Sequence, residues 1–204
     1  MAMNSVLANL VTEVYLLTKR PDLETATKMA VKNATLKLHT SDFFAKDLFE
    51  AGINFPSAAF QQQLEYRTLL PRWRALKYIR KVSQDVTTGE FVGTDFLTIL
   101  SPEAVLDSYG IAKDDIAYIA GEVINIRSST SEQQYILGCY IHPVLSEETF
   151  SSWIANEYKE AVLYDAAATI FKGIGFDEQA AQFRNDGAIW ARQLMINNVP
   201  NTGM

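Results

Sequence analysis

The sequence has a single cysteine, Cys139, among its 204 residues. One cysteine cannot form an intrachain disulfide, and no CxxC pair or cluster of cysteine and histidine is present to hold zinc. Apolar runs fall far short of the roughly 20 residues that a membrane-spanning helix needs. The N-terminus has no signal-peptide pattern, because its apolar stretch is interrupted by Asn4, Asn9, Thr12 and Glu13. We therefore expect a chain that folds in a reducing cytosol and does not enter a membrane.

An excess of positive charge is also missing. The chain carries 18 lysines and arginines against 24 aspartates and glutamates, for a formal net charge of −6 and a pI of about 5.0. A protein whose main role is to hold nucleic acid by releasing counterions usually has a net basic domain. Nucleic-acid binding is therefore not expected as the main function, although DNA can still pass the protein transiently.

The common signatures of catalysis are absent as well. The stretch from Gly173 to Glu178 lacks the third glycine of a dinucleotide-binding loop and follows a helical pattern instead of a strand, so we interpret it as a turn between helices. There is no Walker lysine and no GxSxG elbow. The two histidines, His39 and His142, lie in segments of different type. We expect a protein that is not an enzyme and that binds no cofactor and no metal.

The composition is that of a globular protein with a sizeable core. Hydrophobic residues make up 48% of the chain, aromatic residues 11% and charged residues 21%, which excludes a disordered chain. The length fits one domain, with or without an insert.

Helical periodicity marks the first forty residues. Before Pro21, apolar residues recur at the spacing of one helical face, at Leu7, Leu10, Val11, Val14 and Leu17. A second helix is predicted to begin at Asp22, a good N-cap, and Glu24 stands at a favourable ion-pair spacing before Lys28. An alanine-rich ridge that suits close helix packing is formed by Ala26, Ala30, Ala34 and Leu38.

The middle of the chain, from Phe60 to Ile141, has the short β-branched and aromatic segments that are typical of strands. The clearest prediction is a hairpin that joins residues 123–126 to residues 135–138 through the polar loop 128–132. Between these pieces, Ser101 and Pro102 predict the start of a short helix that runs through Leu106.

Helical patterns return in the last third. Ser151 or Ser152 is predicted to cap a helix that runs through Phe171, and Asp177 to cap the last helix. The first of these is apolar nearly all round, which indicates a central helix or a subunit interface. Its candidate interface residues are Ile154, Tyr158, Ala161, Val162, Asp165 and Ile170. Asp165 lies on an apolar face, so we expect a structural salt bridge or interface contact for it before a catalytic role.

Two further segments are candidate contact surfaces. A stretch without intervening acids contains Arg67, Arg72, Arg74, Lys77, Arg80 and Lys81. Trp73 and Tyr78 are interleaved with these charges, so the stretch could touch phosphate, but strand alternation divides it over two faces and favours an acidic protein partner. The extended C-terminal tail is either frayed or ordered against a partner through Val199, Pro200, Asn201 and Thr202.

Several stretches form a pattern in their joint order. The first half of the chain supplies Thr18, Lys19, Arg20, Pro21 and Asp22; Leu38 and His39; Ser41, Asp42, Phe43 and Phe44; and Leu70, Pro71, Arg72, Trp73 and Arg74. The second half supplies Asp107, Ser108, Tyr109 and Gly110; Ser152, Trp153 and Ile154; Ala166 to Phe171; and Ile174, Gly175, Phe176, Asp177, Glu178, Gln179, Ala180 and Ala181. Over nearly its whole length, the chain thus resembles the head-to-tail adaptor (connector) proteins of tailed bacteriophages.

The resemblance implies an α+β fold, a helical bundle formed by the N- and C-terminal helices with a β-rich insertion in the middle. Residues 1–55 and 147–198 would form the bundle, residues 56–146 the insertion and residues 199–204 a flexible tail. It also implies a ring, expected to have twelve subunits, between the portal protein and a tail or nozzle protein at the head-tail junction of the virion, assembled in the host cytoplasm. Genomic DNA would pass through the ring during ejection, and an acidic lumen would let it slide without sticking.

Two alternatives remain open. The basic stretch from Arg67 to Lys81 could belong to a nucleic-acid-binding module, which predicts strongly salt-dependent binding. A hydrolase or transferase would have to use His39, His142 or Asp165. In the adaptor hypothesis, the basic stretch would instead meet the portal, a neighbouring subunit, the tail or the DNA.

Overall fold

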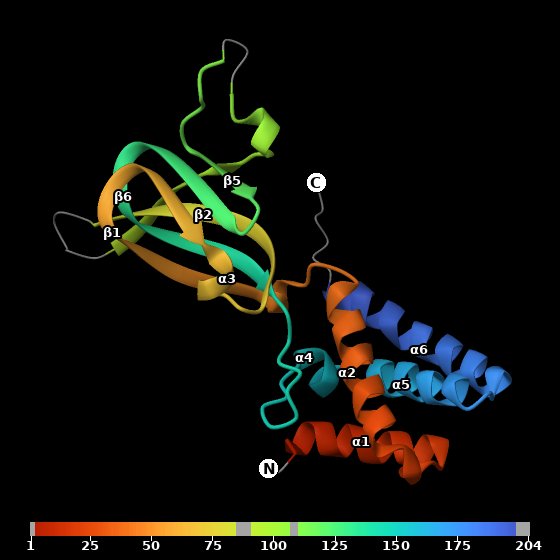
Figure 1. The fold of residues 1–204 in the computed structure, drawn as a ribbon. Coiled ribbons are helices and arrows are strands. Elements are labelled where there is room, and N and C mark those ends of the chain that lie inside the picture. The colour runs from red at the N-terminus through yellow and green to blue at the C-terminus, as the bar shows by residue number, and fades with distance from the viewer. Residues whose placement is uncertain (1–2, 85–90, 107–109, 199–204) are drawn as a thin grey trace. The chain divides into compact units, whose positions relative to one another are not determined.

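The chain folds into two compact units, each with its own hydrophobic core (Figure 1). A computed structural model describes residues 3–84, 91–106 and 110–198. One unit is helical and combines Met1–Asp47 with His142–Met204, whereas the other, Leu48–Ile141, is built on a sheet. The expected boundary between residues 55 and 56 therefore falls within the first strand, and that between residues 146 and 147 falls after the chain has returned to the helical unit.

The N-terminal helices follow the predicted apolar spacing. Helix α1 (Ser5–Thr18) is capped by Asn4, whose Oδ1 accepts a hydrogen bond from the backbone N–H of Val6 at 2.9 Å. A 3-10 turn, η1 (Pro21–Leu23), leads into α2 (Glu24–Thr40). The prediction that Asp22 caps this helix is wrong, because its carboxylate lies in the turn and accepts hydrogen bonds from Arg20 instead.

The first of the C-terminal helices begins where the sequence predicts, whereas Asp177, the predicted cap of the last helix, is the first residue of that helix. Ser152 Oγ accepts a hydrogen bond from the N–H of Ala155 and caps α4 (Trp153–Glu157). The single predicted helix is interrupted at Tyr158, whose backbone leaves the helical region, and continues as α5 (Lys159–Gly173). Gly175 then adopts a φ of +83°, a conformation that favours glycine, in the turn before α6 (Asp177–Asn198).

Helix α5 lies at the centre of the helical unit, where it packs against α1, α2 and α6. Four of the six candidate interface residues, which lie on α4, on α5 and between them, belong to the core of this same chain and are at most 5% exposed: Ile154, Ala161, Val162 and Ile170. Tyr158 is half-buried and packs against this core. The apolar character of the helix is thus satisfied within one chain, and surfaces for a neighbouring copy have to be sought elsewhere.

The other unit is a six-stranded sheet with the order β3-β2-β6-β5-β4, in which β1 also pairs with β6. Its strands are β1 (Leu48–Glu65), β2 (Trp73–Gln84), β3 (Phe91–Phe96), β4 (Thr98–Ile99), β5 (Ile116–Ala120) and β6 (Val123–Ile141). Short helical turns connect them at η2 (Ala45–Asp47), α3 (Tyr66–Leu69) and η3 (Pro102–Ala104). The last of these replaces the longer helix that was expected to run through Leu106.

The predicted hairpin around residues 128–132 is wrong, because these residues lie inside the continuous strand β6. Strands β1 and β6 pair antiparallel from Leu48 opposite Tyr140 to Glu65 opposite Val123, with register shifts between Asn54 and Gln61. The second half of β6 also pairs with β2, and its first half with β5. One long strand therefore organises the whole sheet.

The expected fold class, a helical bundle with a β-rich insertion, is also wrong. The structure is a mixed α/β fold whose sheet of six strands nearly closes into a barrel. The physical reason is that the sheet buries an apolar core of its own, which includes the fully buried Ile79, Ile124, Tyr135 and Leu137. Alternate residues of β6 point into this core, so the strands pack around a core of their own, as the helices do.

Candidate functional site

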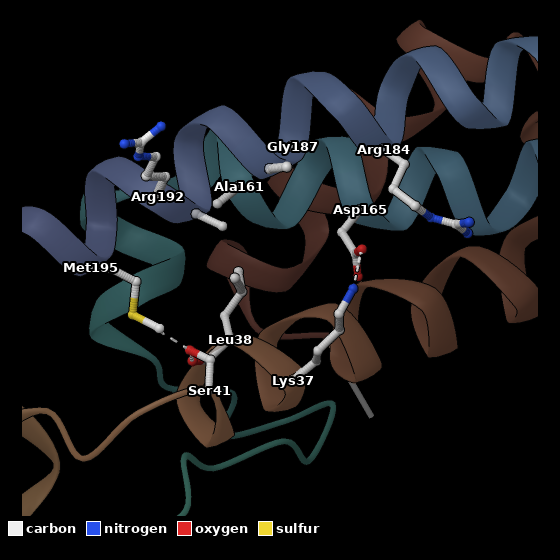
Figure 2. A pocket seen from close by; sticks show the side chains of 11 residues that line it. Lys37, Leu38, Ser41, Ala161, Asp165, Arg184, Gly187, Arg192 and Met195 are labelled. Carbon is white, nitrogen blue, oxygen red and sulfur yellow. Dashed lines mark hydrogen bonds and ion pairs between the residues drawn. The ribbon is translucent and has the colours of Figure 1, made fainter.

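A groove of about 300 Å³ on the helical unit lies between α2, α5 and α6 (Figure 2). Its apolar lining combines the larger side chains Leu38 and Met195 with the small residues Ala161, Gly187, Ala188 and Ala191. Its polar lining consists of Lys37, Ser41, Asp165, Arg184 and Arg192. An apolar floor with a charged rim is suited to binding an apolar side chain that is flanked by charges.

Small residues on α6 create the groove. A Cβ atom at Gly187 would lie 3.3 Å from Cβ of Tyr164 and 3.5 Å from the backbone nitrogen of Asp165. Glycine at this position lets α6 approach α5 closely, while Ala188 and Ala191 leave the space beside it unfilled. The groove is therefore a consequence of how the two helices pack.

Charge on the groove is unevenly compensated. Lys37 Nζ lies 2.5 Å from Asp165 Oδ1, which supplies the ion pair expected for that carboxylate. Figure 2 shows these two side chains meeting, whereas Arg192 points away from them and Arg184 extends from α6 beside Asp165. Within the part of the chain that the structure describes, no acid lies within 4.0 Å of either arginine. The rim thus carries two positive charges without a counter-charge.

The residues of the predicted basic stretch have partners within the chain, and one of them is buried. Arg67 Nε lies 3.0 Å from Glu122, Lys77 Nζ lies over the ring of Tyr140, and Arg80 lies over the ring of Phe96. Both Arg72 and Arg74 also have interaction partners. The remaining member, Lys81, is 4% exposed and cannot contact phosphate on the surface.

Lys81 belongs to a polar cluster inside the sheet unit. Its Nζ lies 2.5 Å from Asp115 Oδ1, and Ser129 donates to the same carboxylate from its backbone N–H at 2.9 Å and from its Oγ at 2.6 Å. Burial by itself raises the pKa of Asp115, but the hydrogen bonds from Lys81 and Ser129 outweigh it and lower the pKa to about 2. These contacts tie the polar middle of β6 to β2 and to the residue before β5.

A second buried polar network connects the two chain segments of the helical unit. His39 Nδ1 lies 2.8 Å from Asp47 Oδ1, and His39 Nε2 lies 2.8 Å from Ser152 Oγ. The indole N–H of Trp153 donates to Asp47 Oδ1 at 2.7 Å. All contacts are satisfied by a neutral imidazole with its proton on Nδ1, because Ser152 Oγ then donates to Nε2 and accepts from Ala155.

This network has the order of contacts of a catalytic triad, yet its surroundings favour a structural role. His39, Asp47 and Ser152 are 1%, 5% and 3% exposed, so a substrate cannot reach the serine oxygen in this structure. The ring of Trp153 packs edge-on against both His39 and Phe44. We interpret the network as a cross-link between the end of α2 and the start of α4.

The remaining candidate residues are not brought together. Asp165 pairs with Lys37 and His39 with Asp47 and Ser152, while His142 follows β6 in the return to the helical unit. The proposed tail residues Val199, Pro200, Asn201 and Thr202 lie outside the described residues. Sequence reasoning missed the groove altogether, since its small residues come from separate helices and carry no chemical signature.

Comparison with known proteins identifies no relative: no protein-family model matches the chain, and no curated protein is significantly similar to it. None of the helices within the described residues is long and apolar enough to cross a lipid bilayer.

Proposed function

We propose that the protein is a structural head-to-tail adaptor of a tailed bacteriophage, whose copies form a ring between the portal and the tail through which the genome passes. The observation that carries this proposal is a set of large apolar side chains that are exposed on three different helices of the helical unit. Leu16 on α1 is 63% exposed and Met29 on α2 is 58% exposed. On α6, Ile189 and Ile196 are 66% and 69% exposed.

These apolar side chains lie on separate helices of one unit whose own core is already filled. Contact with another protein would remove these side chains from water, which is favourable. A two-fold dimer needs only one self-complementary patch, whereas a closed ring needs two different surfaces that meet between neighbours. Apolar residues on α1 and α6, which both pack on α5, fit the second arrangement.

The residues that carry the resemblance to phage adaptors give further support. His39, Phe44, Ser152 and Trp153 come from two stretches more than a hundred residues apart, and they meet in one buried network. Such residues maintain the helical unit, so their order along the chain reflects a structural requirement. Structural proteins without catalytic residues are expected to resemble one another at the residues that maintain their fold.

Imaging the purified protein with and without the portal protein of the same phage tests the proposal. We expect electron microscopy to show rings of this protein seated on the portal, with the portal alone as the control. Both arms are needed, since ring formation can depend on the portal. The absence of rings in either sample, together with no detectable portal binding, would contradict the proposal.

A further inference from the structure

The two arginines on the groove have no acid partner among the described residues, as is also true of Lys19 and Lys172, whereas the other cations of the helical unit are paired. Lys28 and Lys32 lie 3.5 Å and 3.1 Å from Glu147, and Lys159 lies 3.1 Å from Glu13. Arg184 and Arg192 have no such acid among the described residues, although the whole chain has a net charge of −6. They stand eight residues apart on α6, about 12 Å along its axis at 1.5 Å per residue. A ligand for this groove should therefore combine apolar and acidic groups.

A surface with that combination is present on the same unit. Between α1 and α5, a shallow depression of about 280 Å³ is lined by Leu16, Leu17, Leu163, Tyr164, Glu13, Lys159 and Glu160. Leu16 projects into solvent, with 63% of its surface exposed. Glu13 is paired with Lys159, but no cation lies within 4.0 Å of Glu160 in the described part of the chain. This α1 face thus presents an apolar side chain beside an uncompensated acid.

The groove and the α1 face lie on opposite sides of the helical unit. Helices α1 and α6 both pack against α5, and Figure 1 shows them on either side of it. One chain therefore cannot bring its own α1 face to its own groove. Two copies can, and each pair would leave one groove and one α1 face free to bind further copies.

We propose that the groove of one copy binds the α1 face of the next copy, with Leu16 on the apolar floor and Glu160 near the arginines of the rim. This inference deepens the proposed function, because it names the surfaces that would join neighbours in the ring. The contact is heterologous, and it is repeated identically from copy to copy. Opposite charges at its rim would steer the two surfaces into one register.

Engineered cysteines test the contact directly. Thr12 is exposed on α1 one turn from Leu16, and Asn185 is exposed on α6 beside Arg184. The native Cys139 is fully buried, and burial raises the pKa of its thiol to about 11, so it should react slowly with a short bismaleimide. We expect a mixture of Thr12→Cys and Asn185→Cys chains to give cross-linked pairs, and the double variant to give a ladder of higher multimers.

The single variants are the matched controls, because a heterologous contact does not place Thr12 against Thr12 or Asn185 against Asn185. Equal cross-linking of the single variants would indicate a two-fold dimer and overturn the inference. No cross-linking in the mixture would also overturn it, and would indicate that the groove binds a different protein.

Charge reversal provides a second test on the same cysteine pair. Replacing both arginines, Arg184→Glu with Arg192→Glu, should reduce the cross-linked fraction ~tenfold, since opposed rim charges become alike. Lys172→Glu, an exposed cation on α5 away from the groove, should leave cross-linking unchanged. Adding Glu160→Arg to the double arginine variant should restore part of the loss. An unchanged cross-linked fraction in the arginine variant would contradict the assigned register.

The outcomes for this contact and for the adaptor role are separable. Rings seated on the portal without cross-linking would leave the proposed function in place and remove this contact. Cross-linked ladders from a protein that does not bind the portal would keep the contact and remove the adaptor role.

Discussion

Asp115 shows how one residue can stabilise a strand that the sequence alone suggests is a loop. Its φ is +56°, a left-handed conformation that aspartate and asparagine tolerate better than most residues. Its carboxylate holds the ammonium group of Lys81, whose side chain is 5% exposed, whereas its own side chain is 42% exposed. Loss of the ion pair would be costly mainly because of the lysine, since a buried ammonium group without a counter-charge destabilises the folded state.

We expect Asp115→Asn to lower the free energy of unfolding at neutral pH by ~1–3 kcal/mol, since it retains the backbone preference and removes the charge that Lys81 needs. Combining it with Lys81→Met should recover part of this loss, because no charge then remains buried. Urea denaturation of the wild type, both single variants and the double variant gives the coupling energy. Additive losses would show that the ion pair does not stabilise the sheet.

The same carboxylate predicts a pH dependence. Its pKa is lowered to about 2 in the folded protein, below the value of about 3.9 for an unfolded aspartate. A lowered pKa means that the stabilisation is fully present above the unfolded value and is lost as the pH falls toward about 2. The difference in stability between the wild type and Asp115→Asn should therefore shrink as the pH falls from about 5 to about 2.

At the scale of elements, the buried network determines how the end of α2 meets the start of α4. Asp47 Oδ1 accepts hydrogen bonds from both His39 and Trp153. Asparagine at this position keeps a side-chain oxygen that can accept both, whereas alanine removes the acceptor and leaves two buried donors unpaired. The two substitutions therefore separate hydrogen bonding from charge.

We predict that Asp47→Ala lowers the free energy of unfolding by ~2–4 kcal/mol and that Asp47→Asn costs clearly less. Thr40→Ala, at an exposed position on the neighbouring turn, is the control and should change stability by no more than about 0.5 kcal/mol. Chemical denaturation followed by tryptophan fluorescence and circular dichroism measures all three. Equal losses for the alanine and asparagine variants would show that the acceptor oxygen is not what holds the elements together.

The helices could be predicted from sequence because their signals are local. The apolar spacing of α1, the ion pair of Glu24 with Lys28 at 2.7 Å and the cap at Ser152 each involve residues within one or two turns. The strands were harder to predict from the sequence. Residues 128–132 are polar, and what holds them in β6 is a carboxylate at Asp115 and an ammonium at Lys81, which a pattern of neighbouring residues does not reveal.

The candidate site was predictable only in part, for the same reason. An acid on an apolar helix face needs a partner, so the ion pair of Asp165 was expected, but its partner Lys37 lies 128 residues away. The helix that includes α5 was expected to be central or to lie at a subunit interface, and the small residues of α6 beside it were not recognised as the floor of a groove. The aspartate and the serine that contact His39 were not identified either, because Asp47 and Ser152 lie in other segments of the chain.

At the scale of the whole molecule, the chain leaves the helical unit at Asp47 and returns to it at His142. The first and last residues of the sheet unit lie on paired strands, with Leu48 opposite Tyr140. Paired residues of an antiparallel ladder have Cα atoms about 5 Å apart, so the two exits from the helical unit are close neighbours. The helical unit also has a complete core and a cross-link between its two chain segments.

We therefore predict that residues 48–141 can be replaced by a short glycine-serine linker of about four residues without unfolding the helical unit. The shortened chain should give a strongly helical circular dichroism spectrum, a cooperative thermal transition and a fluorescence from Trp153 and Trp190 that changes on unfolding, since only Trp73 is removed with the sheet. It should also retain the cross-link between Thr12→Cys and Asn185→Cys copies, because the groove and the α1 face both belong to the helices. A folded but non-associating helical unit would mean that the sheet contributes to the contact between copies, whereas a non-cooperative transition would show that the two cores depend on each other.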